Sequence, residues 1–467
     1  MAEPLTLAGF DFGSTTSRCV LAQGSVRRHA VTGRMELANM RLAYAPQAVF
    51  TPFAGDSLDA DRLASQLDEW IGGWGTSPSD VAAGAIVTGL AARAANADVV
   101  ARLVRQRLGD TLIATADDPA LEAWLAFMGN AAGLSRAKPD RTFVNLDIGG
   151  GTTNFAAGRA GQVLTTGCYY LGARHLRFEP GTYTLAGVST FGARLLDELG
   201  LARGPGDDLT ADDVDRIVEF HVAVMEAVLL GDDETLQRDV VAFHRNLVFR
   251  PPSDRDMVIT LSGGVGELAY RCHRGEALPA TTAYGDLGIE LARRIAASPL
   301  LSRDLASEIP AELGRATVCG LAIHNTQISG ATTFLPRPDL LPLCDLPIVG
   351  RLGCESDDDE MAALVALASR GARGGCLAID ELSGDHPTIA SWGGRLAAAL
   401  ERGGYPPERP LVLLVTSNIG KTLGNYATRW GRLSVQLIVV DEIAPRDARF
   451  ASLGRLRENV VPVVFYG

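Results

Sequence analysis

The chain has 467 residues, of which 47% are hydrophobic and 21% charged, and its formal net charge at pH 7 is −12. This length predicts roughly three domains, and the acidic balance argues against a nucleic-acid or anionic-membrane partner. No apolar run approaches the roughly 18 residues that span a bilayer, and the amino terminus lacks the order of a secretory signal. We therefore expect a cytoplasmic protein.

Two segments repeat one pattern, in which an apolar run ends in an aspartate that glycine and hydroxyl residues follow. Residues 9–18 read GFDFGSTTSR, and residues 145–155 read NLDIGGGTTNF. Apolar runs flank each glycine turn, which predicts two β-hairpins. The four expected strands are 5–10, 19–23, 142–148 and 154–158. The two segments look like copies of one unit.

Elsewhere, strand-like and helix-like segments alternate, which predicts an α/β fold. Between the hairpins, the expected elements are helices at 60–72, 97–108 and 118–129 and strands at 83–89 and 111–116. An acidic loop at 204–216 leads into a helical region that continues to about residue 247. Residues 257–267 read as a strand, a glycine turn and the start of a helix, and 316–325 as a returning strand or helix.

From about residue 331 the chain changes to a proline-containing linker, FLPRPDLLPLCDLP. Beyond the linker we expect strands at 376–380, 411–416 and 435–440 with helices between them, which predicts a separate C-terminal α/β module. The expected domains are 1–140, with the first hairpin, 141–330, with the second hairpin and a helical insertion, and 331–467.

The glycine turns are typical of a phosphate cradle, because glycine lets backbone N–H groups approach an anion. The expected phosphate contacts are Gly13, Ser14, Thr15 and Thr16 in the first turn and Gly149, Gly150, Gly151, Thr152 and Thr153 in the second. Asp11 and Asp147 cannot face a phosphate directly, but they can hold a hydrated Mg²⁺ that bridges to it. One such turn alone is equally well explained as a tight hairpin. The repetition favours a nucleotide clamped between two facing domains.

The stretch LSGGVGE (261–267) follows an expected strand and opens a helix. Gly263 and Gly264 would let the flat face or the sugar of a ligand lie against the backbone, and Glu267 could accept hydrogen bonds from ribose hydroxyls. A simple strand-to-helix connection is the alternative.

With DFGSTT, NLDIGGGTT and LSGGVGE in this order, about the first 330 residues resemble the actin, sugar kinase and heat-shock chaperone ATPase superfamily. Nearly end to end, the chain is similar to the ethanolamine ammonia-lyase reactivating factors. The closer match is carried by AGAIVTG (83–89), IATADDPALEA (113–123), NLDIGGGTTNFA (145–156), ITLSGGVGE (259–267), YGDLGIELA (284–292), NIGKTLG (418–424), VVDEIAPRDA (439–448) and VVPVVF (460–465).

The resemblance implies an actin-like ATPase fold with two duplicated facing domains, a nucleotide cleft and a C-terminal α/β module. It implies ATP and Mg²⁺ as ligands and ethanolamine ammonia-lyase, an adenosylcobalamin enzyme, as partner. With ATP, such factors promote exchange of damaged cobalamin for intact cofactor. Association with a bacterial microcompartment and assembly into a homo-oligomer are open expectations of the same resemblance.

A residue that positions the attacking water is still needed, and the resemblance places it in DDPALEA. Glu122 is the expected residue, and Asp118 is interpreted as a helix cap. Thr88, Gly89 and Leu90 stand where the family leads us to expect T-G-E. If that glutamate assists hydrolysis, this chain hydrolyses ATP slowly.

Two further functions stay open: an actin-like nucleotide-binding scaffold with little turnover, which Leu90 favours, and a small-molecule kinase of the same fold, for which no sugar-kinase motif is evident. The stretch LVLLVTSNIGKT (411–422) is not interpreted as a P-loop. A P-loop requires GxxxxGK[ST], and Val415 occupies the first glycine position. Lys421 is therefore assigned to the module surface or to a partner contact.

Overall fold

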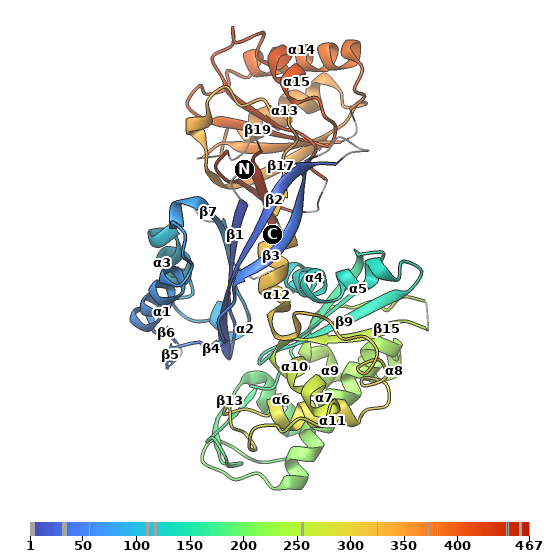
Figure 1. Ribbon diagram of the computed structural model, residues 1–467. Coiled ribbons are helices and arrows are strands. Elements are labelled where there is room, and N and C mark those ends of the chain that lie inside the picture. The colour runs from blue at the N-terminus through green and yellow to red at the C-terminus, as the bar shows by residue number, and fades with distance from the viewer. Residues whose placement is uncertain are drawn as a thin grey trace.

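The computed structural model describes residues 5–466 except 30–34, 56, 109–111, 116–118, 254–255, 325, 372, 381, 445, 447 and 457–459. Three large β-sheets with their helices build two lobes and a C-terminal module (Figure 1). Among the described residues, every helix is too short or too polar to span a bilayer.

The first lobe is built on a sheet with the strand order β3-β2-β1-β7-β8, with β4 paired to β2. Its strands are β1 (Leu5–Phe12), β2 (Thr16–Arg28), β3 (Met35–Tyr44), β4 (Val49–Phe50), β7 (Val81–Val87) and β8 (Leu112–Thr115), with the small pair β5 (Phe53–Ala54) and β6 (Ser57–Leu58) beside them. Strand β1 is antiparallel to β2 and parallel to β7.

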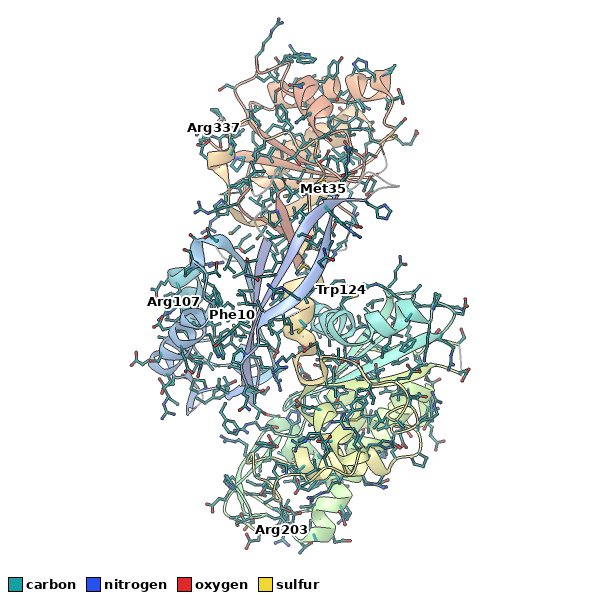
Figure 2. The ribbon with its side chains drawn as sticks, in the orientation of Figure 1. Phe10, Met35, Arg107, Trp124, Arg203 and Arg337 are labelled. Carbon is teal, nitrogen blue, oxygen red and sulfur yellow. The ribbon has the colours of Figure 1, made fainter. Side chains whose placement is uncertain are left out.

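The alternation of side chains along β1 separates the core of the first lobe from its functional face. Phe10 and Phe12 are fully buried against α1 (Ala60–Gly72), where the Phe10 ring centroid lies 6.1 Å from that of Trp70 (Figure 2). Helix α3 (Asp98–Leu108) contributes valines to the same core. Asp11 therefore lies on the opposite face of the sheet.

The second lobe repeats this arrangement in a sheet with the order β14-β11-β10-β9-β15. Its strands are β9 (Thr142–Ile148), β10 (Thr153–Arg159), β11 (Gln162–Tyr169), β14 (Arg245–Leu247) and β15 (Val258–Ser262), with the small pair β12 (Leu176–Phe178) and β13 (Leu185–Val188). Strand β9 is antiparallel to β10 and parallel to β15, as β1 is to β2 and β7. Asp147 in β9 therefore has the position that Asp11 has in β1.

Helices cover both faces of the second sheet. They are α4 (Pro119–Asn130), α5 (Ala132–Ala137), α6 (Thr190–Glu198), α7 (Ala211–Leu230), α8 (Asp233–Leu236), α9 (Asp239–His244), α10 (Gly263–His273) and α11 (Gly288–Ala297). Val144, Leu146 and Ile148 pack in the core that includes α7, α10 and α11. Phe143, on the other face of β9, packs against α4. Asp147 shares the face of β9 that α4 covers.

A helical wedge joins the two lobes. It consists of α12 (Ala316–Cys319) and a π-helical turn, Gly320–His324, and it packs against α4 and β1. A Cβ atom at Gly129 of α4 would lie 1.9 Å from the Ala316 carbonyl oxygen, and one at Gly9 of β1 would lie 2.7 Å from the Val318 carbonyl oxygen. Glycine is needed at both places because the backbones touch.

The module is built on a seven-stranded sheet with the order β16-β22-β21-β17-β18-β19-β20. Its strands are β16 (Thr326–Ile328), β17 (Leu343–Leu352), β18 (Gly375–Ile379), β19 (Pro410–Val415), β20 (Gln436–Val440), β21 (Phe450–Leu453) and β22 (Pro462–Tyr466). Helices α13 (Asp358–Ala368), α14 (His386–Arg402) and α15 (Gly420–Ala427) pack on one face. Because β16 directly follows the wedge, the wedge also leads into this sheet.

The module also touches the second lobe. The Arg446 guanidinium lies 4.5 Å from the centroid of the Trp124 ring on α4, which is labelled in Figure 2. A cation held over an aromatic face is an attractive contact.

The structure confirms both hairpins and most of the expected helices and strands, and it resolves 316–325 as helical as far as His324. Two expectations are wrong. The expected proline-containing linker contains the first half of β17, and the helical region expected to continue to 247 is broken after α7 and ends in β14. Asp118, the expected cap, lies outside the described residues.

Candidate functional site

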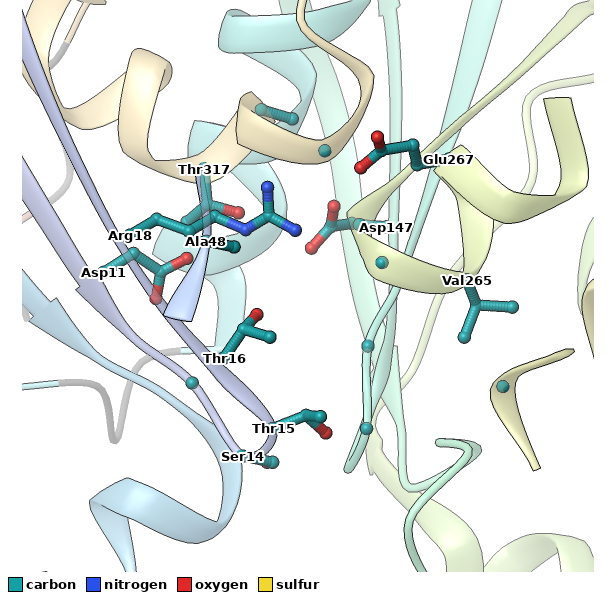
Figure 3. Close-up of a pocket in the computed structure, with 18 of the residues that line it drawn as sticks. Asp11, Ser14, Thr15, Thr16, Arg18, Ala48, Asp147, Val265, Glu267 and Thr317 are labelled. Carbon is teal, nitrogen blue, oxygen red and sulfur yellow. The ribbon is translucent and has the colours of Figure 1, made fainter. Parts of the chain in front are cut away.

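A cleft of about 650 Å³ lies between the two lobes. It is lined by both glycine turns, the start of α10 and the segment that leads into α12 (Figure 3). The sequence-predicted residues that the structure brings together here are Asp11, Gly13, Ser14, Thr15, Thr16, Glu122, Asp147, Gly149, Gly150, Gly151, Thr152, Gly263, Gly264 and Glu267.

The two glycine turns have the same backbone closure. The Gly13 N–H donates to the Thr16 carbonyl oxygen at 3.0 Å, and the Gly149 N–H donates to the Thr152 carbonyl oxygen at 2.9 Å. The two segments that repeat in sequence therefore also form the same backbone hydrogen bond.

Thr51 backs the first turn from outside the repeat. Its hydroxyl donates to the Gly13 carbonyl oxygen at 2.8 Å, and its N–H donates to the Thr15 carbonyl oxygen at 3.0 Å. A carbonyl and the N–H of the same planar peptide point in opposite directions. Fixing these carbonyls therefore turns the N–H groups of Ser14 and Thr16 away from Thr51.

The segment after β11, residues 171–174, lies behind the second turn and hydrogen-bonds to it. The Ala173 N–H donates to the Gly149 carbonyl oxygen at 3.2 Å, and the Arg174 N–H donates to the Gly150 carbonyl oxygen at 2.6 Å. A Cβ atom at Gly172 would lie 2.3 Å from the Gly150 carbonyl oxygen, so only glycine allows the two segments this close.

Thr153 is a correction to the predicted site, because it does not line the cleft. It is fully buried, and its hydroxyl donates to the Leu171 carbonyl oxygen at 2.6 Å. Thr153 is the first residue of β10, where alternation directs its side chain into the lobe. In this structure it connects β10 to the segment 171–174 behind the turn.

The turns of the two lobes meet across the cleft. A Cβ atom at Gly150 would lie 2.4 Å from the Thr15 hydroxyl oxygen, and one at Gly151 would lie 3.0 Å from the Ser14 hydroxyl oxygen. In Figure 3, Ser14 and Thr15 stand opposite the second lobe. The hydroxyls of one lobe therefore face the bare backbone of the other.

Three carboxyl groups gather behind the turns: Asp147 is buried, and Asp11 and Glu122 are half-buried. Burial raises the pKa of Asp11 to about 7, although the positive charge of Arg18 lowers it. Burial also raises the pKa of Asp147, against a hydrogen bond of 2.5 Å from the Ser262 hydroxyl. Burial, together with the charges of Asp147 and Asp11, raises the pKa of Glu122 to about 8. Such a cluster is stabilised by added positive charge.

Arg18 is a site residue that the sequence reasoning missed. It lies directly opposite Asp11 across β1 and β2, and its guanidinium reaches into the cleft beside Asp147 (Figure 3). Burial lowers its pKa, while Glu267, Asp11 and Asp147 favour its charged form. Arg18 lies within GFDFGSTTSR, seven residues after the aspartate, but the pairing of the two residues comes from the strand register.

Asn154 occupies the corresponding register position in the second lobe, opposite Asp147. It is 2% exposed, and a hydrogen bond from its amide lowers the pKa of the neighbouring Glu122, against the effect of burial. Buried amide groups are normally hydrogen-bonded. The sequence reasoning missed this residue too, although it lies within the second motif.

The start of α10 forms the far wall of the cleft. Gly263 has φ +80°, and a Cβ atom there would lie 2.5 Å from the Ile148 carbonyl oxygen, so glycine is required by its own lobe. A Cβ atom at Gly264 would meet open space, and Gly264 and Glu267 line the cleft with Arg271 and Arg315. Of the two glycines, Gly264 is the one beside which a ligand could lie.

The remaining residues discussed from the sequence divide into two that line the cleft, one that follows them, and Lys421 in the module. Thr88 and Gly89 line the cleft, and Leu90 follows in α2 (Gly89–Ala92). Lys421 is exposed in the first turn of α15, in the module, and is not among the residues that line the cleft.

The repeated sheet topology and the cleft between the lobes are those of an actin-like fold with a C-terminal α/β module. This confirms the fold expected from the motifs. Among solved structures, an exopolyphosphatase-like protein is 16% identical with a TM-score of 0.41, covering 69% of this chain and 97% of that one. Ethanolamine utilization protein EutJ from Carboxydothermus hydrogenoformans is 16% identical with a TM-score of 0.30, covering 69% and 90%.

Sequence comparison gives a closer relationship. The proteins named ethanolamine ammonia-lyase reactivase EutA from Salmonella typhimurium and Escherichia coli are each 29% identical to the chain, and each match covers 98% of this chain and 97% of the relative. A family model described as ethanolamine utilisation protein EutA matches residues 3–466. The chain therefore belongs to the EutA family.

Proposed function

We propose that this protein is an ATP-dependent reactivating factor for ethanolamine ammonia-lyase, which promotes exchange of damaged cobalamin for intact cofactor. The observation that carries the proposal is the pair of facing glycine turns, each preceded by an aspartate that lines the same cleft between the two lobes. Membership of the EutA family supports the choice of partner.

The residues of the cleft fit a nucleotide with Mg²⁺. A volume of about 650 Å³ lies within the usual range for small-molecule sites. The raised pKa values of Asp11 and Asp147 reflect carboxylates that a cation would stabilise. The described residues contain no cluster of three or more His, Cys, Asp or Glu that could hold a metal. Two aspartates with water completing the shell match the way Mg²⁺ is usually bound. When bound, Mg²⁺ supplies charge neutralisation between carboxylates and phosphates.

The chain's own residues divide the work of ATP hydrolysis. The two glycine turns hold the phosphates by backbone N–H groups, and Arg18 adds a cationic donor beside them. Glu122 accepts a hydrogen bond from the attacking water and orients it. Positioning and charge neutralisation are most of what phosphoryl transfer needs.

The walls of the cleft suggest how nucleotide binding affects the C-terminal module. Arg315 and Thr317 line the cleft at the entrance to the wedge, and the wedge continues into β16 of the module sheet. A nucleotide that favours one lobe arrangement would therefore bias the module. We propose that 1–140, 141–330 and 331–467 act as the three domains in this movement, with α4 and α5 moving together with the second sheet against which they pack. We also propose that the protein works in the cytoplasm, in association with a microcompartment.

A nucleotide-binding scaffold with little turnover is the second candidate. Its support is Leu90, which stands where the family pattern leads us to expect a glutamate. Gly89, the residue before it, lines the cleft. Binding of ATP without hydrolysis would favour this candidate over the reactivating factor.

The test uses ethanolamine ammonia-lyase inactivated with cyanocobalamin. Purified protein is added with free adenosylcobalamin, with and without ATP and Mg²⁺, and the recovery of ammonia release is followed. The proposal predicts recovery only with nucleotide and Mg²⁺. An Asp212→Ala variant, altered at an exposed position of α7, serves as the matched control and should behave as wild type. No recovery despite ATP binding would reject the reactivating role.

A further inference from the structure

All three carbonyls of the second glycine turn are held from one side. Ala173 and Arg174 hold the carbonyls of Gly149 and Gly150 through their backbone N–H groups, which any residue but proline could supply. The Gly151 carbonyl oxygen instead lies 2.8 Å from Nε2 of the His175 ring. The third bond of the series is therefore the only one of the three that depends on the identity of a side chain.

The hydrogen-bond network fixes the tautomer of His175. A carbonyl oxygen only accepts, so Nε2 carries the proton and donates to Gly151. On the other side of the ring, Nδ1 lies 2.9 Å from the Ser189 hydroxyl, which in turn accepts from the Gly192 N–H at 3.1 Å. Ser189 is the N-cap of α6, so its hydroxyl proton points at Nδ1. The chain of donors runs one way, from the start of α6 to the glycine turn.

The imidazole is neutral at every working pH. His175 is 5% exposed, and burial lowers its pKa to about 3. The ring also packs against Phe191, with centroids 5.3 Å apart. A neutral ring with one proton cannot donate to Ser189 and Gly151 at once, which keeps the direction of the network fixed.

We propose that His175 is a positioning residue for phosphate binding, which holds the Gly151–Thr152 peptide so that the Thr152 N–H faces the cleft. In a planar peptide, the Gly151 carbonyl and the Thr152 N–H point in opposite directions. With the three carbonyls directed at residues 173–175, the N–H groups of Gly150, Gly151 and Thr152 are directed at the other side, where an anion is bound. The proposal rests on the proposed nucleotide-binding function.

The Gly151–Thr152 peptide could also adopt a flipped orientation, and this explains why the His175 side chain is needed. A flip of this peptide rotates ψ of Gly151 and φ of Thr152, and glycine leaves the first of these torsions unhindered. A flipped peptide would present the Gly151 carbonyl oxygen, instead of an N–H, to a negatively charged phosphate. His175 prevents this by offering the carbonyl a donor on the side away from the cleft.

Two substitutions separate this role from simple packing. A glutamine amide nitrogen can take the place of Nε2, so His175→Gln keeps the donor to Gly151. An asparagine amide reaches only the place of Nδ1, so His175→Asn keeps the contact with Ser189 and loses the donor to Gly151. Dissociation constants for AMPPNP and for adenosine, measured on the full chain with Mg²⁺, report phosphate and nucleoside binding separately.

The expected result is that His175→Asn weakens AMPPNP binding about tenfold, the usual effect of one lost hydrogen bond, and leaves adenosine binding unchanged. His175→Gln should stay within about threefold of wild type for both ligands. His221→Asn is the matched control, because His221 is equally buried and bonds only to the Ile217 carbonyl oxygen of its own helix among the hydrogen bonds of its described side chain. It should leave the ratio of the two affinities unchanged.

Equal behaviour of the Asn and Gln variants, or a parallel loss of both ligands, would overturn the proposal and leave His175 as a packing residue. If His175→Asn fails to fold, Ser189→Ala provides the second route, since it removes the hydroxyl that fixes the tautomer. It should weaken AMPPNP about threefold without changing adenosine. Wild-type protein that binds neither ligand would reject the proposed function itself, a result distinct from wild-type binding with unaffected variants.

Discussion

The two glycine turns have the same closure but different supports. Each closes with an N–H to carbonyl bond between residues three apart, at 3.0 Å in the first lobe and 2.9 Å in the second. Behind the first stands one residue, Thr51, whose hydroxyl in turn lies 2.9 Å from the Ser17 hydroxyl. Behind the second stands a three-residue segment that ends in His175. The repeat provides the turn, and each lobe stabilises it with residues of its own.

The lobes differ more in charge than in shape. Asp11 has Arg18 opposite it in the sheet, whereas Asp147 has Asn154. Glu122, the third carboxyl group, comes from α4, which covers the Asp147 face of the second sheet. The first lobe thus brings a cation to the cleft and the second brings an extra acid. Under the proposed function, this asymmetry would let the first lobe bind phosphate charge while the second orients the attacking water.

Removal of the aspartates should have the largest effect. Asp147→Ala deletes a proposed ligand of the hydrated metal and should lower Mg²⁺-dependent ATP hydrolysis by about a hundredfold or more, because charge neutralisation supplies much of the rate acceleration in phosphoryl transfer. Asp11→Ala should lower it less, because Arg18 remains in the first lobe. Steady-state phosphate release measures both variants, and unchanged turnover in Asp147→Ala would eliminate the metal assignment.

Glu122→Gln should separate hydrolysis from binding. The amide keeps the size of the side chain but cannot act as a base, so single-turnover hydrolysis should fall about a hundredfold, while the dissociation constant for AMPPNP stays within about twofold. Circular dichroism should show an unchanged fold. A normal single-turnover rate would exclude Glu122 as the residue that orients the water.

Arg18→Gln tests the charge difference between the lobes. Loss of the guanidinium removes a charged donor from the phosphate region and should weaken AMPPNP binding about tenfold to thirtyfold, with adenosine unaffected. Arg102→Gln is the matched control, because Arg102 is an exposed arginine of α3 paired with Asp98. If both variants bind AMPPNP like wild type, Arg18 serves only to balance the acids of the cleft.

The stability of the nucleotide-free protein should depend on pH through the same acids. Asp11 and Glu122 have folded pKa values of about 7 and about 8, above their ordinary values of 3.8 and 4.5. Between about pH 4.5 and 8 these two groups keep protons in the folded protein that they have released in the unfolded chain, so their contribution to stability falls as pH rises through this window.

Thermal melts at pH 7 and pH 8.5 check this, because the buried histidines are neutral in the folded protein over this range and largely neutral in the unfolded chain. The expected loss is on the order of 2 kcal/mol for wild type. Glu122→Gln should flatten the dependence, because the amide does not titrate. A wild-type melting temperature that is higher at pH 8.5 than at pH 7 would contradict the assignment of these acids as protonated in the folded protein.

The sequence predicted the repeated parts of the molecule best. The pattern D-x-G with hydroxyl residues depends on local turn chemistry, so both turns and both aspartates were found, and they meet in one cleft. Thr153 was misplaced because the repeat of two threonines hides the alternation of β10, which directs the second threonine inward.

What the sequence did not reveal depends on contacts between distant segments. Thr51 and His175 support the turns from 38 and 24 residues away, and neither carries a motif. The last residues of the expected linker, 343–347, belong to β17. They form a strand because β17 pairs with β21 and β18, and no local sequence signal reveals these distant partner strands. Arg18 was within the first motif, but its role appears only when the register across β1 and β2 is known.

The most direct test is calorimetric titration of AMPPNP into the full chain, with Mg²⁺ and with Mg²⁺ removed by chelation. We expect one binding site per chain and an affinity at least about tenfold higher with Mg²⁺, a difference that Asp147→Ala abolishes. Binding that is equally strong without Mg²⁺, or no binding at all, would contradict the claim that two aspartates and two glycine turns clamp one metal–nucleotide complex between the lobes.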